Sequence, residues 1–278
     1  MADYLRPTSL DEALAALAER PWTMLAGGTD VYPAAVGRPI TDDVLDVTGL
    51  PSLRAITLAD GLVRIPALAT WTDLGRADLP LAFDGLKAAA RSIGGVQIQN
   101  RGTLAGNLCN ASPAADGLPN LMALDARVEL SSAADRREVP VGEFVVGNRR
   151  TVRRPDELVT AILVPEPSAT ARSTFLKLGS RAYLVISIAS VAAVIDVAPD
   201  GRVASARIVV GACSEVPARV EPAEARLAGR SASPSLAESI EAVDLAGLAP
   251  IDDVRGTAAY RRDVALTLVR RAVRELLA

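Results

Sequence analysis

The first segment with chemical potential is a glycine turn. A short apolar run over residues 23–26 leads into Leu25-Ala26-Gly27-Gly28-Thr29-Asp30. Because glycine carries no Cβ, the backbone N–H groups of such a turn can approach an anion closely, as a pyrophosphate requires. The spacing matches neither G-x-G-x-x-G nor a P-loop with its lysine, which disfavours a Rossmann-type or phosphoryl-transfer site. A Gly-Gly turn is more often structural, so alone it assigns no function.

A second segment, residues 94–120, is rich in neutral hydrogen-bonding side chains set among glycines. A solvated loop more often carries Lys and Glu, whereas a loop around a dinucleotide needs close backbone approach and hydrogen bonds without a fixed charge. We therefore expect residues 94–120 to form a long ordered loop that binds a ligand together with the first turn. The polar residues are Asn100, Arg101, Thr103, Asn107, Asn110 and Ser112, and the glycines are Gly94, Gly95, Gly102 and Gly106.

What the chain lacks narrows its chemistry further. It contains no histidine, which removes Ser-His-Asp and Cys-His nucleophile systems and histidine-ligated metals. Its two cysteines, Cys109 and Cys213, lie far apart without a CxxC partner, so neither a metal site nor an iron–sulfur cluster is encoded. We interpret Cys109 as a small buried space-filler. No catalytic residue is predicted, and the chemistry has to come from a bound cofactor.

The charge balance excludes several partners. Thirty basic residues stand against 33 acidic ones, a net charge of −3, which leaves no electrostatic footprint for nucleic acid or an anionic membrane. The longest apolar stretch, residues 184–195, is interrupted by two serines and is too short to span a bilayer. The N-terminus lacks a basic region followed by an apolar core, so a cytoplasmic protein without an integral membrane segment is expected.

Short elements position the two polar segments. Residues 9–12 have the spacing of a capping box at the start of a helix that Pro21 ends, and residues 23–26 indicate a short buried strand. Alternating runs between residues 44 and 74 favour small strands separated by Gly and Pro. Residues 81–93 have a helical pattern.

The chain of 278 residues exceeds a usual domain of about 100 to 200 residues, so two domains are expected. The best boundary is Val164-Pro165-Glu166-Pro167-Ser168, because its prolines bar helix and central strand. Beyond it, residues 185–197 and 206–210 are β-rich, and the turn residues 198–201 between them predict a hairpin. A C-terminal helix is expected over residues 257–277. Its apolar stripe is predicted along Tyr260, Val264, Leu268, Ala272 and Leu276.

Three motifs together carry a family resemblance. They are Leu25-Ala26-Gly27-Gly28-Thr29-Asp30, then Gln97-Ile98-Gln99-Asn100-Arg101-Gly102-Thr103-Leu104-Ala105-Gly106-Asn107, then Asn110-Ala111-Ser112-Pro113-Ala114-Ala115-Asp116. In this order they resemble the signatures of the medium, FAD-binding subunit of molybdenum hydroxylases, a family that includes carbon monoxide dehydrogenase and bacterial xanthine dehydrogenases. The resemblance continues through residues 156–158 and 175–181, so it covers nearly the whole chain.

The resemblance implies a role for each matching residue. The FAD pyrophosphate would lie against the first turn and the second segment. Asp116 would accept from a cofactor hydroxyl or brace its loop, Leu158 would present its backbone to the flavin ring, and Lys177 would stabilise the reduced anionic flavin unless it is merely solvated. Tyr183 is a weaker candidate for covering the ring. The pyrophosphate residues implied are Leu25, Ala26, Gly27, Gly28, Thr29 and Asp30, with Thr103, Ala105, Gly106, Asn107, Asn110 and Ser112 as the second half.

The resemblance also implies a fold and a complex. The fold is α+β, with a two-subdomain FAD-binding domain of the vanillyl-alcohol-oxidase type over residues 1–166, divided near residue 55. A small antiparallel sheet with helices follows over residues 167–278. The molybdenum cofactor would lie on a large partner subunit and the iron–sulfur clusters on a small one, in a dimer of heterotrimers. This chain would then pass electrons to NAD or another acceptor.

Two alternatives stay open at this point. The chain could be a free-standing flavin oxidoreductase with its own substrate pocket, although no histidine is available as a base or flavin anchor. It could also be an assembly protein that kept the fold and lost the flavin. Three departures from the family pattern bear on this: Ala105 replaces a usual glycine, Gln99 a usual arginine, and residues 66–70 lack their usual initial glycine. A methyl group at position 105 requires a negative φ there.

Overall fold

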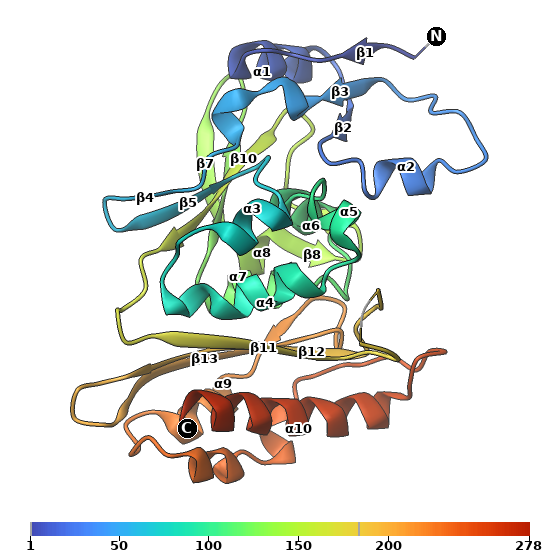
Figure 1. Ribbon diagram of the computed structural model, residues 1–278. Coiled ribbons are helices and arrows are strands. Elements are labelled where there is room, and N and C mark those ends of the chain that lie inside the picture. Colours follow the sequence, from blue (N-terminus) through green and yellow to red (C-terminus); the bar gives the residue numbers. More distant parts are fainter. Residues whose placement is uncertain (1, 183) are drawn as a thin grey trace.

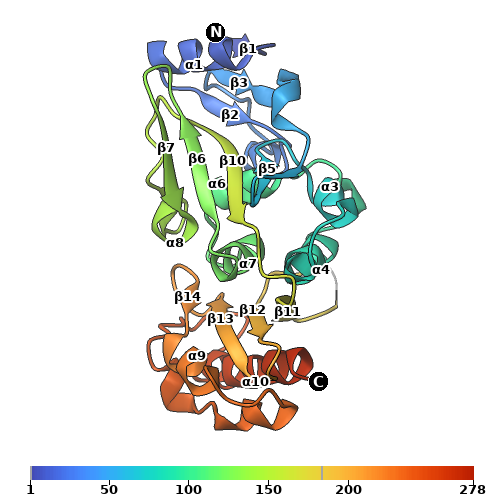
Figure 2. The ribbon, with the colours of Figure 1, turned by 90° about the vertical axis from the view of Figure 1, so that its left-hand side faces the viewer.

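The computed structural model describes residues 2–182 and 184–278, so the weaker candidate Tyr183 lies outside the described residues. Helices and sheets are stacked along the long axis of the molecule, from the N-terminal sheet through a larger sheet and a layer of helices to a C-terminal sheet covered by helices (Figures 1 and 2). The predicted α+β class is confirmed.

The N-terminal layer is a small parallel sheet. Its strand order is β1 (Tyr4–Leu5), β3 (Val44–Asp46), β2 (Thr23–Leu25), and the helices beside it are α1 (Leu10–Glu19) and α2 (Val31–Ala34). The Ser9 hydroxyl caps α1 by accepting from the Glu12 N–H at 3.2 Å, as predicted. The Glu12 carboxylate, however, accepts from the N–H of Thr8 at 2.9 Å rather than from the cap residue. The predicted helix and strand are therefore confirmed, and the capping box is displaced by one residue.

The largest sheet is antiparallel, with β10 in its centre. The order is β4 (Thr57–Ala59), β5 (Leu62–Pro66), β10 (Leu158–Pro165), β6 (Arg127–Ser131), β7 (Arg136–Pro140). Every residue of β10 except the last is buried, which explains its continuous apolar sequence. A separate two-stranded hairpin is formed by β8 (Val145–Gly147) and β9 (Arg150–Thr151).

The expectation of a long loop over residues 94–120 is wrong, because this segment contains two short helices and the start of a third. The glycines and asparagines of this segment have low helix propensity, so the sequence pattern does not predict these helices. Helices of four to seven residues depend on caps and packing more than on propensity. Thr103 supplies one cap, its hydroxyl accepting from the Gly106 N–H at 2.9 Å. The helical layer comprises α3 (Trp71–Arg76), α4 (Asp84–Ser92), α5 (Val96–Gln99), α6 (Leu104–Asn110), α7 (Gly117–Ala123) and α8 (Val141–Phe144). The predicted helix over 81–93 is α4, preceded by a 3₁₀ turn at Leu81–Phe83.

The C-terminal sheet has the order β11 (Arg172–Leu178), β12 (Ala189–Val197), β13 (Val203–Gly211), β14 (Ala218–Arg219). The predicted hairpin is confirmed as β12 and β13, with Gly201 at a φ of 79° in its turn. One face packs on α4 and α7, and the other on α9 (Glu221–Leu227) and α10 (Ala258–Leu276) (Figure 1). Alternate side chains of β12 accordingly enter two different hydrophobic cores. Because the first core also contains residues of the preceding layers, the proposed division near residue 166 stays a prediction.

The C-terminal helix is confirmed as α10, but its predicted stripe is misplaced. Tyr260 is 46 % exposed, and the buried face instead carries Arg261, Ala265, Val269, Ala272 and Val273. The guanidinium of Arg261 donates to Asp253 at 2.6 Å and to the Ala212 carbonyl at 3.1 Å. The buried arginine interrupts the apolar pattern. In addition, the predicted residues are four apart, whereas a helical turn has about 3.6 residues, so the predicted stripe rotates away from the buried face along the helix.

Candidate functional site

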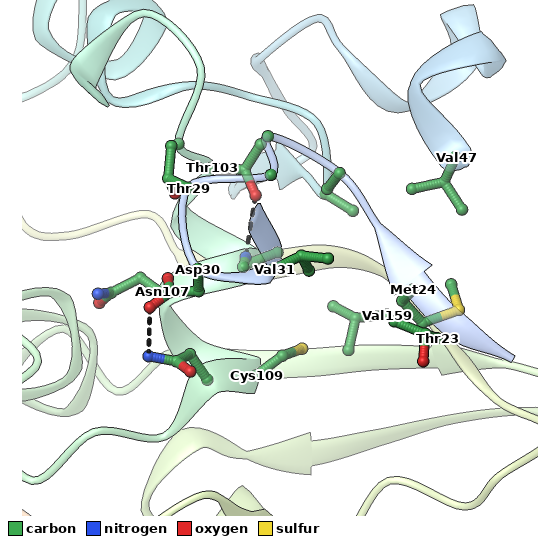
Figure 3. Close-up of a pocket in the computed structure, with 18 of the residues that line it drawn as sticks. Thr23, Met24, Thr29, Asp30, Val31, Val47, Thr103, Asn107, Cys109 and Val159 are labelled. Carbon is green, nitrogen blue, oxygen red and sulfur yellow. Dashed lines mark hydrogen bonds between the residues drawn. The ribbon is translucent and has the colours of Figure 1, made fainter. Parts of the chain in front are cut away.

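A cavity of about 650 Å³ lies where the N-terminal sheet, α6 and the start of β10 meet. Its two ends differ in character. Thr29, Asp30, Thr103 and Asn107 gather at one end, whereas apolar side chains such as Met24 line the other (Figure 3). A volume in the range of about 300 to 1,000 Å³ with a few convergent polar groups is typical of a small-molecule site. The two motif segments, more than 60 residues apart in sequence, thus line one cavity.

The glycine turn packs directly against the second segment. A Cβ at Gly27 would overlap the carbonyl oxygen of Arg101, and the hydroxyl of Thr29 lies beside Gly102. Gly28 has a φ of 73°, a conformation that L side chains rarely adopt, and the ring of Tyr32 covers the space where its side chain would be. Gly27 is therefore required because the turn lies against the Arg101 carbonyl, and Gly28 is required because of its positive φ.

Several polar groups at this end of the cavity lack partners. The N–H groups of Gly27, Gly28 and Thr29 have no acceptor within residues 2–182 and 184–278. The side-chain Oδ1 of Asn107 is buried and likewise accepts no hydrogen bond from the described residues. Because a buried acceptor without a partner costs about 1–3 kcal/mol, such a set of groups indicates a place for a hydrogen-bonding ligand.

A hydrogen-bonded chain joins the two segments to the β8–β9 hairpin. The Asn110 amide donates to Asp30 Oδ1 at 3.1 Å, and its oxygen accepts from Arg149 Nη1 at 3.2 Å (Figure 3 draws the first of these bonds). The backbone N–H of Arg149 also donates to the carbonyl of Ala111 at 3.0 Å. Arg149 lines the cavity, yet nothing in its local sequence distinguishes it from the neighbouring arginines.

Ala105 fits its place without strain. It lies in the first turn of α6, is 4 % exposed, and lines the cavity. It is not among the described residues with a positive φ, so its methyl group satisfies the condition stated for this position. The replacement of the usual glycine therefore leaves the backbone of the cavity intact.

The apolar walls come largely from residues that the motifs do not include. Both tryptophans of this aromatic-poor chain, Trp22 and Trp71, line the cavity. Trp22 is fixed by its Nε1–H, which donates to the Ala16 carbonyl at 2.9 Å. The rarity of tryptophan in this chain is a sequence signal that draws attention to both residues, but it does not place them in the cavity. Further lining residues outside the motifs are Thr23, Val31, Val47, Ala67, Ile93, Thr151, Arg153 and Val159.

Four of the implied site residues do not line the cavity. Leu25 ends β2 in the core, 6 % exposed, and Ser112 uses its hydroxyl to accept from the Ala114 N–H at 3.3 Å. Asp116 and Lys177 form a salt bridge, with 2.7 Å between Oδ2 and Nζ. The remaining implied residues from Ala26 to Asp30, from Thr103 to Asn110, and Leu158 all line it.

The salt bridge between Asp116 and Lys177 belongs to a buried set that we call the Asp116 cluster: Asp116, Lys177 and Ser187. The Ser187 hydroxyl donates to Asp116 Oδ1 at 2.6 Å, so both carboxylate oxygens are satisfied. The side chains of Asp116 and Lys177 are only 7 % and 11 % exposed. This cluster ties the start of α7 to the C-terminal sheet, which favours the brace among the two roles considered for Asp116.

Next to Leu158 at the edge of the cavity, Glu157 is fully buried and held by arginines. Burial by itself would raise the pKa of Glu157, but hydrogen bonds from Arg137 at 2.6 Å and from the Arg154 backbone at 2.7 Å outweigh it and hold the pKa below its usual range. The carboxylate stays ionised and joins Arg137 and Arg154 to the start of β10.

Cys109 is open to the cavity, so the prediction that it is buried is wrong. The surrounding protein nevertheless raises the pKa of its thiol to about 11, chiefly by desolvation. A thiol with that pKa is protonated at neutral pH and is a poor nucleophile. No cluster of three acidic or cysteine residues that could hold a metal ion is found in the described part of the chain.

Comparison with known proteins decides the family. A family model described as the FAD binding domain in molybdopterin dehydrogenase matches residues 1–167, and one described as the CO dehydrogenase flavoprotein C-terminal domain matches residues 174–276. The chain belongs to the FAD-binding subunits of molybdenum hydroxylases. It is 30 % identical to the xanthine dehydrogenase FAD-binding subunit of Escherichia coli, over all of this chain and 96 % of that one.

Two further proteins are similar to this chain over nearly its whole length. The glyceraldehyde dehydrogenase medium chain of Sulfolobus acidocaldarius is 31 % identical over 98 % of this chain and 97 % of its own length. The structure of reconstituted CO dehydrogenase from Oligotropha carboxidovorans matches with a TM-score of 0.91 at 28 % identity, covering 100 % of this chain and 98 % of that one. None of the described helices is both long and apolar enough to cross a membrane.

The residues of the cavity fit the cofactor of this family. A dinucleotide presents a charged diphosphate and aromatic ring systems, and the cavity offers free N–H groups and an arginine at one end and apolar walls at the other. The orphaned oxygen of Asn107 is an acceptor for a hydroxyl or amide donor of a ligand.

Proposed function

We propose that this FAD-binding subunit holds its cofactor in the cavity described above and passes electrons from iron–sulfur clusters of a partner subunit to NAD or another acceptor. The observation that carries the proposal is the meeting of the glycine turn and the α6 segment around unpartnered polar groups. FAD, when bound, exchanges single electrons with clusters and electron pairs with a final acceptor.

In this proposal the chain's own residues bind and orient rather than transfer protons. The backbone N–H groups from Gly27 to Thr29 donate to the diphosphate, and the oxygen of Asn107 accepts from the cofactor. The apolar walls, including Trp22 and Trp71, exclude water from the ring systems. The roles of Leu25, Ser112 and Asp116 would be indirect, since these side chains lie outside the cavity, and Lys177 would reach the flavin only from the edge of the C-terminal sheet.

The proposal includes an assembly. Relatives are named as medium subunits or chains, which supports one large and one small partner subunit. We propose that the molybdenum cofactor is bound by the large partner and the iron–sulfur clusters by the small one, in a dimer of heterotrimers. The names of the relatives cover xanthine, nicotinate, glyceraldehyde and carbon monoxide, and the substrate of this chain's complex would be set by the large partner. A cytoplasmic location stays a prediction.

The test is to produce the chain alone and together with candidate large and small partner subunits from the same organism, and to record absorbance spectra before and after anaerobic addition of candidate substrates. We expect flavin bands in both preparations, bleaching by substrate only in the complex, and recovery of the bands on addition of NAD or an artificial acceptor. Substrate bleaching of the isolated chain would instead identify a free-standing oxidoreductase. A colourless chain that takes up no added FAD would contradict the proposal.

A further inference from the structure

Arg149 is a cation of the cavity that none of the motifs includes. It stands in the turn between β8 and β9, is exposed, and lines the cavity. Within the described residues its guanidinium has a single hydrogen-bond acceptor, Asn110 Oδ1, and no carboxylate partner. Of the five N–H donors of an arginine, four are therefore free to bind a ligand.

The other arginines nearby are already committed. Arg153 also lines the cavity, but its Nη1 donates to the carbonyls of Arg154 at 3.0 Å and Glu157 at 2.7 Å. Arg150, the next residue along the chain from Arg149, lies 3.7 Å from a carboxylate oxygen of Glu215, outside the cavity. Within the described residues, Arg149 is thus the arginine of this group whose guanidinium has neither a carboxylate nor a backbone carbonyl as a partner, its one acceptor being the side-chain oxygen of Asn110.

The backbone holds Arg149 in place at some cost. Its φ is 56°, in the left-handed region that non-glycine residues seldom occupy, and its N–H is tied to the Ala111 carbonyl at 3.0 Å. An uncommon conformation that the surroundings enforce is a reason to look for a function at that residue. Asn110 then orients the side chain, because its amide is fixed by Asp30, the last residue of the glycine turn, at 3.1 Å.

Resting on the proposed function, we propose that Arg149 is the counter-charge of the FAD diphosphate. The diphosphate carries two negative charges, and the glycine turn offers it only neutral N–H groups, with the carboxylate of Asp30 close by. A guanidinium can donate two parallel hydrogen bonds to a phosphate, which a lysine cannot. The bond to Asn110 uses only Nη1 of Arg149, so the remaining N–H groups of the guanidinium are free to donate to a phosphate.

The test measures FAD affinity rather than activity. FAD is removed from the full chain, and its rebinding is followed by quenching of flavin fluorescence at several sodium chloride concentrations. Arg149→Asn is the main variant, because asparagine tolerates the left-handed region and preserves the turn. Arg149→Lys keeps the charge without the fork. Arg150→Gln is the matched control, since it removes a neighbouring charge that pairs with Glu215 and does not line the cavity.

We expect Arg149→Asn to raise the Kd for FAD by about 10- to 100-fold and to reduce the dependence of the Kd on salt. Arg149→Lys should restore part of the affinity, and Arg150→Gln should behave as wild type. All four proteins should unfold at the same denaturant concentration without FAD. Wild-type affinity in Arg149→Asn overturns the inference, as does a loss of affinity with an unchanged salt dependence, which would place Arg149 on a neutral part of FAD. If wild type itself binds no FAD, the proposed function fails instead.

Discussion

Two polar regions of the molecule were both expected to serve the cofactor, and their hydrogen bonding differs. Around the cavity, the N–H groups of the glycine turn and the oxygen of Asn107 have no partner among the described residues. In the Asp116 cluster, the carboxylate accepts from the Lys177 ammonium at 2.7 Å and from the Ser187 hydroxyl at 2.6 Å, and all three groups are nearly closed to solvent.

The difference distinguishes a ligand-binding site, whose polar groups lack partners in the protein, from a structural cluster, whose polar groups bond to one another. Burying a polar group without a partner is costly, so a fold keeps such groups only where something else completes them. A buried carboxylate whose two oxygens are both paired needs no ligand, and the loss of its cation is costly because the charge stays buried. We therefore expect substitutions in the cavity to change FAD affinity and substitutions in the Asp116 cluster to change stability.

The largest effect should come from breaking the buried pair. Lys177→Met leaves the Asp116 carboxylate buried without its cation and should lower the free energy of unfolding by about 3–5 kcal/mol. Asp116→Leu combined with Lys177→Met removes both charges and should recover most of that loss. Denaturant titration measures both. The control is Lys87→Met, the only other lysine of the chain, which lies half-buried on α4. If Lys177→Met keeps its stability and loses FAD instead, the lysine serves the flavin directly and the contrast between the regions is lost.

The next effect concerns the contact between the two segments. Gly27→Ala places a methyl group on the Arg101 carbonyl, so the segments must move apart. We expect FAD affinity to fall at least about 10-fold, with a loss of stability of about 1–3 kcal/mol from overpacking. Gly75→Ala in α3 is the control, because its Cβ would meet open space, and helix propensity there should raise stability slightly. Equal FAD affinity in both variants would show that the close approach at Gly27 does not shape the site.

A smaller effect should distinguish Asn107, whose side-chain oxygen has no hydrogen-bond partner among the described residues, from Asn120, whose amide is hydrogen-bonded. Asn107→Leu removes a buried acceptor that has no partner, so the FAD-free protein should be as stable as wild type or up to about 2 kcal/mol more stable, while FAD binds about 10-fold more weakly. Asn120→Leu, in contrast, removes a buried amide that donates to the Asp116 carbonyl at 2.8 Å, and it should destabilise without a specific effect on FAD. Thermal unfolding with and without FAD tests both variants. Destabilisation of FAD-free Asn107→Leu would mean that the amide has a structural role.

The sequence predicts the parts of the site whose chemistry is local. Residues 25–30 and 103–107 could be placed at one site because tight turns and caps depend on neighbours along the chain. Arg149, Trp22 and Trp71 could not, since each enters the cavity from an element whose position is set by tertiary packing. The pairing of Asp116 with Lys177, 61 residues apart, is likewise invisible in sequence, because charge alone does not say which partner it meets. The short helices of residues 94–120 were hidden because packing, rather than propensity, supports them.

The smallest effect contrasts the two cysteines, whose thiols share a pKa of about 11 but differ in exposure. Cys109 is open to the cavity, whereas Cys213 is fully buried and donates to the Arg261 carbonyl at 3.8 Å. We expect iodoacetamide to modify one thiol in the FAD-free native protein. Its rate should rise about tenfold per pH unit between pH 7 and 10, because only the thiolate reacts. FAD should slow this reaction, and denaturant should expose the second thiol. Modification of both cysteines at equal rates in the native protein would mean that exposure does not distinguish the cavity from the core.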